Sequence, residues 1–160
     1  MSKQARELKN LMTEMFGIGG NILPVIVESV DKINNTCEVK YDNLEFGGIR
    51  LQAAIKENQK GIKVYPAVNS SVLIQKLGNK GEWFVCMFSE VEEIITEIGE
   101  LKQTTNKDGY VFKKGNDTLW DGIKLLIESL EKVIVLQGTN IDKGKLAQAK
   151  TKIKNVLNGS

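Results

Sequence analysis

Between Ile22 and about Glu97 the sequence consists of short runs rich in Val and Ile, separated by turn-forming residues such as Gly and Asn. This spacing limits the fold most strongly, because such runs form β-strands and the residues between them form tight turns. Five strands in so short a stretch favour a small closed antiparallel barrel, of which the OB-fold is the common five-stranded example. The predicted barrel strands are residues 22–30, 36–41, 49–55, 72–77 and 83–88.

The segments around these strands are expected to extend the β structure. Gly47 and Gly48 follow Phe46 and interrupt the pattern as a bulge or loop would. Residues 62–66 lead into the fourth strand, and residues 91–98 continue as β structure. A short β ribbon then follows over residues 99–116, turning at Lys107-Asp108-Gly109.

The last third of the chain is predicted to form a helical hairpin. Asn116 or Asp117 can cap a helix that runs to about Ile134, and Asp142 can cap a second helix over residues 143–157. In the first helix, apolar residues alternate steps of four and three, which is typical of a seam against a partner helix. The residues predicted for this oligomer interface are Leu119, Ile123, Leu126, Leu130 and Val133.

A second apolar stripe on the same helix leaves the partner of the seam open. Trp120, Ile127 and Ile134 widen the apolar face beyond what one neighbouring helix would cover. The helices therefore pack either between chains or back on their own hairpin and barrel.

The N-terminal segment is predicted to be a short amphipathic helix followed by a Gly-rich joint. Its apolar residues fall on one stripe at helical spacing, and Gly17, Gly19 and Gly20 end it. The stripe consists of Leu8, Leu11, Met12, Met15 and Phe16. The complete division is a helix and joint (1–20), a barrel (21–98), a ribbon (99–116) and a helical oligomerisation segment (117–160).

Composition argues against an enzyme. The 160 residues include no His, which removes the commonest general base and the commonest metal ligand. We therefore predict no catalytic residue, no metal ligand and no cofactor. Cys37 and Cys86 lie in apolar runs outside any C-x-x-C motif, so we expect two reduced, buried thiols. No run is long enough to insert in a membrane and no signal peptide is present, so we expect the chain to fold in a cytoplasm.

The same residues fit two other functions less well. A glycan-cleaving enzyme needs two carboxylates across a cleft, whereas Glu90, Glu92 and Glu93 lie on one short segment at the expected solvent edge of the barrel. An OB-fold that binds single-stranded nucleic acid needs a basic groove with exposed aromatic residues. The net charge is only +2, and the aromatic residues fall at core positions, so nucleic acid is an alternative partner that we do not favour. The lysines in or beside loops are Lys56, Lys60, Lys63, Lys76 and Lys80.

A string of short motifs in fixed order resembles a known family. The motifs are the runs at residues 51–55 (LQAAI), 64–74 (VYPAVNSSVLI) and 83–91 (WFVCMFSEV), followed by KDGYVF at residues 107–112. Together they resemble the baseplate and tail-spike proteins of phages and prophages of Bacteroidetes-type bacteria. The resemblance covers roughly residues 20–125 and weakens in the C-terminal helices.

The resemblance implies an OB-fold at the head of a homotrimeric spike or hub on the tail axis. In such proteins the barrel docks to other tail proteins and the strands beyond it intertwine. The chain would then belong to the virion tail and be assembled in the cytoplasm of the bacterial host. The sequence departs from the usual spike in lacking both a long Gly-punctuated β repeat and an iron-binding tip with His ligands, so a hub or connector fits as well as a spike.

Overall fold

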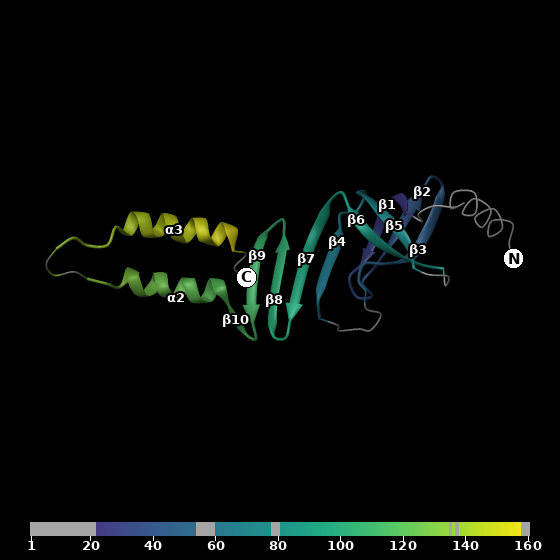
Figure 1. Cartoon of the computed structure of the whole chain (residues 1–160). Helices are drawn as coiled ribbons and strands as arrows, with labels where there is room; N and C mark the ends of the chain where they lie inside the picture. The colour runs from purple at the N-terminus through teal and green to yellow at the C-terminus, as the bar shows by residue number, and fades with distance from the viewer. Residues whose placement is uncertain (1–21, 54–59, 78–80, 135, 137, 158–160) are drawn as a thin grey trace.

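The computed structural model describes residues 22–53, 60–77, 81–134, 136 and 138–157. A barrel, an open β-sheet and a helical hairpin follow one another in a row, with the barrel nearest the N-terminus (Figure 1). The chain is therefore mainly β with two C-terminal helices, as predicted. The predicted N-terminal helix and its Gly-rich joint lie outside the described residues.

The barrel confirms the predicted OB-type fold. Its strands close in the order β1-β2-β3-β6-β5, so that β5 returns to pair with β1. Neighbouring strands are antiparallel except β3 and β6, which run parallel and are paired at Arg50 and Phe84. The prediction of a wholly antiparallel barrel is therefore wrong at this one junction. The strands are β1 (Ile22–Asp31), β2 (Thr36–Tyr41), β3 (Leu44–Arg50), β5 (Ser71–Leu77) and β6 (Glu82–Phe88).

The third strand was placed too late by sequence reasoning. The prediction was residues 49–55, whereas β3 begins at Leu44 and the chain bends from Leu51. Phe46 and its two glycines lie within β3, where Phe46 pairs with Val39 and the register shifts next to that pair. Gly48 adopts a φ of 73°, which an L side chain rarely allows. The glycines thus form a bulge inside a strand and do not separate two strands.

Alternating burial along the strands builds the barrel core. In β1, the side chains of Leu23, Val25 and Val27 are buried and those between them are exposed. Such alternation directs one face of each strand inward, and burying a Val or Ile side chain contributes about 1.5–3 kcal/mol. The most buried members of the core are Val27, Cys37, Val39, Ile49, Val72 and Ile74.

The predicted β ribbon is part of a larger open sheet. Five antiparallel strands lie in the order β10-β9-β8-β7-β4, so the ribbon strands β8 and β9 continue the sheet that β7 and β4 begin. The boundary predicted at residue 98 does not separate the two units, because β4 and β7 pair with each other and not with the barrel strands. The strands are β4 (Ile62–Pro66), β7 (Val91–Ile98), β8 (Leu101–Asn106), β9 (Gly109–Lys114) and β10 (Asp117–Thr118).

The two helices begin close to the predicted positions. α2 (Leu119–Glu131) is capped by Thr118, whose hydroxyl accepts a hydrogen bond from the backbone N–H of Asp121 at 3.1 Å. The predicted caps Asn116 and Asp117 are wrong, because Asp117 and Thr118 pair with β9 as β10. α3 (Lys143–Val156) is capped by Asp142 as predicted.

Removing volume from the barrel core should destabilise the protein strongly. Ile74 is fully buried, so Ile74→Ala should lower the free energy of unfolding by about 2–5 kcal/mol in urea titrations followed by circular dichroism. Ile33, whose side chain is 81% exposed in the β1–β2 turn, provides the matched control. Ile33→Ala should change stability by less than about 0.5 kcal/mol. Equal losses in the two variants would contradict the barrel as described.

Candidate self-association surface

One side of α2 packs within its own chain. Trp120 and Ile127 are buried, and α2 contacts α3, β9 and β10. Leu157, at the end of α3, is also buried and forms an isolated bridge with Tyr110 of β9. Two members of the predicted second stripe, Trp120 and Ile127, therefore close the helical hairpin on the edge of the sheet. The third, Ile134, is 81% exposed and lies beyond the end of α2.

The predicted seam lies beside this contact and is not covered by the part of the chain that the structure describes. Leu119, Ile123, Leu126 and Leu130 follow the spacing of three and four that places side chains on one side of α2. Val133 lies beyond the end of the helix at Glu131, so the helix is shorter than the predicted extent to about Ile134. Ile123 is half-buried, and the other four side chains are exposed. Their exposed fractions are 48% for Leu119, 61% for Leu126, 36% for Leu130 and 43% for Val133. We name these five residues the α2 stripe.

A second exposed apolar surface lies on one face of the open sheet, and sequence reasoning missed it. Directly paired residues of antiparallel strands share a face. Phe112 pairs with Gln103, Gln103 with Thr96, and Thr96 with Ile62, so this row crosses four strands on one face. Parallel rows add further apolar side chains, all at least 37% exposed. We name this surface the apolar sheet face, which comprises Ile62, Ile94, Ile98, Leu101, Tyr110 and Phe112.

The sequence contains the spacing that forms the apolar sheet face, but this spacing can be interpreted only when the register of the paired strands is known. Ile94 and Ile98 are an even number of residues apart, as are Tyr110 and Phe112, so each pair shares a face of its strand. Only the pairing of β7 with β8 and of β8 with β9 shows that all four belong to the same face. Tyr110 and Phe112 stack with ring centroids 6.3 Å apart.

The opposite face of the sheet is charged and packs toward the barrel. Lys63 and Lys102 each lie 3.5 Å from a carboxylate oxygen of Glu97. On the same face, Tyr65 is buried and Ile95 packs against the barrel core. The sheet thus has one face packed on the barrel and one apolar face that stays exposed among the residues that the structure describes.

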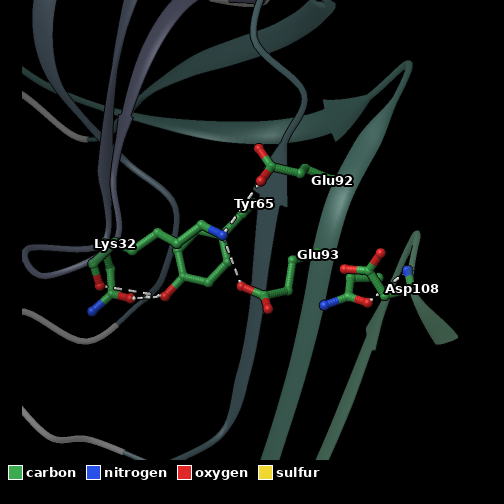
Figure 2. A network of polar contacts seen from close by, with 7 residues as sticks. Lys32, Tyr65, Glu92, Glu93 and Asp108 are labelled. Atoms are coloured by element: carbon green, nitrogen blue, oxygen red, sulfur yellow. Dashed lines mark hydrogen bonds and ion pairs between the residues drawn. The ribbon is translucent and has the colours of Figure 1, made fainter. Parts of the chain in front are cut away.

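Tyr65 joins the sheet to the barrel (Figure 2). It belongs to β4, yet the residue is only 2% exposed and is part of the barrel core. Its hydroxyl donates a hydrogen bond of 2.8 Å to the Oδ1 atom of Asn35 in the β1–β2 turn. The Nζ atom of Lys32, from the same turn, lies 5.2 Å from the centre of the ring. Lys32 Nζ is also 2.9 Å from Glu93 Oε2 and 3.6 Å from Glu92 Oε1, which lie on β7.

These contacts shift two pKa values upward. The pKa of Lys32 is raised chiefly by its hydrogen bond to Glu93, against the smaller opposing effect of desolvation. The pKa of Tyr65 is raised chiefly by burial, and the negative charge of Glu93 acts in the same direction. Both shifts favour the protonated groups that hold the barrel turn on the sheet.

The carboxylates considered for catalysis are found at this junction. Glu92 and Glu93 contact one lysine, and Glu93 has a side chain only 16% exposed. Glu93 is thus a paired carboxylate and does not form the solvent edge of a barrel. Glu90 is exposed in the turn before β7.

Two of the lysines considered for nucleic-acid binding form contacts within the chain. Lys63 pairs with Glu97, and Lys60 donates a hydrogen bond to the backbone oxygen of Gly99. Lys76 is half-buried at the end of β5. Lys56 and Lys80 lie outside the described residues.

The two cysteines are free thiols. Cys37 is buried in the core, as expected, and burial raises its pKa to about 12. Cys86 is half-buried, and its thiol donates a hydrogen bond of 3.2 Å to the backbone oxygen of Leu73.

Within the described ranges, no group of three or more Cys, Asp or Glu side chains is arranged to hold a metal ion. Neither described helix is long and apolar enough to cross a bilayer. Comparison of the chain with protein-family models, curated proteins and solved structures finds no match.

The junction predicts a specific response to alkaline pH. Tyr65→Phe removes the hydrogen bond to Asn35 and should lower the free energy of unfolding by about 1 kcal/mol near neutral pH. Because the pKa of Tyr65 is higher in the folded than in the unfolded chain, its contribution is complete below the unfolded value of about 10 and declines above it. The stability curves of wild type and variant should therefore converge above about pH 10 in urea titrations.

Tyr110→Phe is the matched control for this measurement, because the ring of Tyr110 is 43% exposed on the sheet. Near neutral pH this variant should have the same free energy of unfolding as the wild type. A constant gap between Tyr65→Phe and wild type across the alkaline range would contradict the buried tyrosine described at the junction.

Proposed function

We propose that this chain is a non-enzymatic structural protein that associates with copies of itself through the α2 stripe. The supporting observation is that four of the five stripe residues stay exposed although the other side of the same helix is buried. Monomeric soluble proteins rarely expose contiguous apolar patches, and such patches commonly mark protein–protein contacts. The apolar sheet face adds a second surface of the same kind.

The arrangement of the molecule favours assembly at one end. The α2 stripe and the apolar sheet face both lie on the sheet and helical hairpin, beyond the barrel (Figure 1). Copies that associate through these parts leave their barrels free to contact other proteins. This separation supports a trimeric hub or spike in the tail of a phage or a related injection device, as the motif resemblance implies. The barrel would then dock to other tail proteins.

The non-enzymatic part of the proposal is supported by the side chains that were candidates for catalysis. Glu92 and Glu93 lie at adjacent positions in β7 and contact the same lysine. A general acid and a second carboxylate acting on one substrate must instead face each other across it. The arrangement at the junction therefore fits a structural role for these carboxylates.

Charge placed in the α2 stripe should dissociate the assembly. Wild-type protein at tens of micromolar should have the solution mass of a trimer by light scattering. The double variant Leu126→Asp with Leu130→Asp should have the mass of a monomer or should aggregate, because each unpaired buried carboxylate costs several kcal/mol. A monomeric wild type would refute the proposal.

Leu125→Asp is the matched control. Leu125 is 65% exposed on α2, similar to Leu126, but it is out of step with the spacing of the stripe. Its replacement should leave the mass unchanged. Equal dissociation by Leu125→Asp would show that the effect comes from added charge and not from the α2 stripe.

The apolar sheet face should contribute independently to the same assembly. Ile98→Asp places a charge at a side chain that is 70% exposed in the single chain, so the fold should be retained in circular dichroism. We expect the concentration for half-dissociation to rise by at least about tenfold, which corresponds to about 1.4 kcal/mol. Ile33→Asp, on the barrel turn, should leave it unchanged. No change in Ile98→Asp would exclude this face from the interface.

A further inference from the structure

Lysines gather at one end of the charged face of the open sheet. Glu97 of β7 pairs with Lys102 of β8, and Lys102 pairs with Lys113 of β9, so these side chains form one row on that face. The row lies next to the β7–β8 turn, at the end of the sheet where β4 begins (Figure 1). A cavity of about 340 Å³ is found there, and its charged lining is Lys60, Glu97, Glu100, Lys102 and Lys113. We name it the lysine cavity.

The positive charge at the lysine cavity is only partly neutralised. Glu97 is the shared partner of Lys102 and Lys63, each of which lies 3.5 Å from one of its carboxylate oxygens. Lys60 donates a hydrogen bond to a backbone oxygen of the β7–β8 turn and contacts no carboxylate in the described ranges. Lys113 likewise has no ion-pair partner among the residues that the structure describes. Two ammonium groups of the cavity therefore lack a counter-charge from this part of the chain.

The pairing of Lys102 with Lys113 adds a repulsion to this excess. Like charges directly opposite each other on neighbouring strands destabilise a sheet. The side chain of Lys102 is 46% exposed and Lys113 is also exposed, so a solute can reach both. An anion in contact with both ammonium groups would replace the repulsion by two charge-assisted hydrogen bonds, which are about twice as strong as neutral ones.

We propose that the lysine cavity binds a small oxyanion with two negative charges, of the phosphate or sulfate class, through Lys60, Lys102 and Lys113. Each ammonium group has three N–H donors, and Lys60 uses one of them on the β7–β8 turn. Donors therefore remain on all three side chains for the oxygens of the ion. A bound ion connects the segment that leads into β4 with β8 and β9, and so stabilises this end of the sheet.

The charges around the cavity favour a small dianion over other ligands. Counting Lys63, which reaches Glu97 from β4, four lysines face two carboxylates here, Glu97 and Glu100. The excess of two positive charges disfavours a metal cation and matches a dianion. A single-stranded nucleic acid would also need aromatic side chains on which its bases stack. Tyr110 and Phe112 lie on the opposite face of the sheet, so the cavity fits a small ion better.

Titration of the full-length chain with inorganic phosphate tests this site by isothermal titration calorimetry. The ionic strength is held constant with sodium chloride at about pH 8, where the lysines are charged. We expect saturable binding with a Kd of about 1 mM or lower. Lys113→Gln should raise this Kd at least about tenfold, because it removes an ammonium group that the proposal places on the ion.

Lys107→Gln is the matched control. It also removes one exposed lysine, but from the β8–β9 turn at the other end of the same strands. Its Kd should equal that of the wild type. Equal weakening by Lys107→Gln would overturn the proposal, because the effect would then come from net charge alone. Absence of saturable binding up to about 10 mM phosphate would overturn it as well.

A single-stranded oligonucleotide provides the competing arm. Oligonucleotide binding at least about tenfold tighter than that of phosphate, and lost in Lys113→Gln, would overturn the small ion in favour of nucleic acid. No oligonucleotide binding, together with the phosphate result above, supports the proposal.

Urea titrations provide a second, independent measurement. Phosphate at about ten times its Kd should lower the ratio of unfolded to folded wild-type chain about elevenfold, compared with sodium chloride of equal ionic strength. At the same concentration the ratio for Lys113→Gln should fall only about twofold. An equal decrease in the two proteins would show a general effect of phosphate and refute the site. A monomeric wild type would refute the proposed self-association but would leave these results unchanged, so the two proposals fail separately.

Discussion

The burial of Tyr65 is the contact on which the rest of the structure depends. A tyrosine ring removed from water contributes several kcal/mol, and here the strand that supplies it belongs to a different sheet from the core that receives it. The hydrogen bond to Asn35 satisfies the hydroxyl, and the ion pair of Lys32 with Glu93 closes over the ring. The barrel and the open sheet therefore share one core, and the direction of the sheet relative to the barrel is set by a few side chains.

That fixed direction explains why the apolar surfaces are separated. The charged face of the sheet is turned to the barrel, so the apolar sheet face points away from the described part of the chain. α2 follows directly from β10 at the other edge of the sheet and buries one side of itself there. Apolar side chains that remain exposed lie both at the assembly end of the molecule and on the barrel strands, as at Ile22, Ile26 and Met87. These locations suit a protein that contacts different neighbours at different places.

Most of the barrel could be predicted from the sequence, because alternating Val and Ile residues specify both the strand and its buried face. The strand predictions are wrong where the local sequence indicates one structure and the pairing with a distant strand imposes another. Gly47 and Gly48 indicated a break, but the pairing of Phe46 with Val39 keeps them inside β3. Residues 62–66 read locally as a lead-in to the next strand, because nothing within them indicates that β4 pairs with β7. The apolar sheet face could not be predicted for the same reason, because the residues that share a face of several strands depend on the register in which the strands pair.

The α2 stripe shows the opposite case. Its spacing was fully present in the sequence, and the structure places its residues together beside the buried pair Trp120 and Ile127. The sequence alone contains two apolar stripes on one helix and does not show which of them packs within its own chain. The edge of β9 and the end of α3 make that choice, because they contact the side of the helix that presents Trp120 and Ile127.

The path of the chain between its two sheets has a consequence for how the protein is made. After three barrel strands, β4 enters the open sheet, and the chain then returns for β5 and β6 before β7 arrives to pair with β4. On a ribosome, β4 therefore emerges well before its partner strand, and the barrel closes while one edge of β4 still lacks β7. The two units cannot be separated by a single cut in the chain. From β7 onward the strands and helices follow one another consecutively, so a fusion at the helical end interrupts neither sheet.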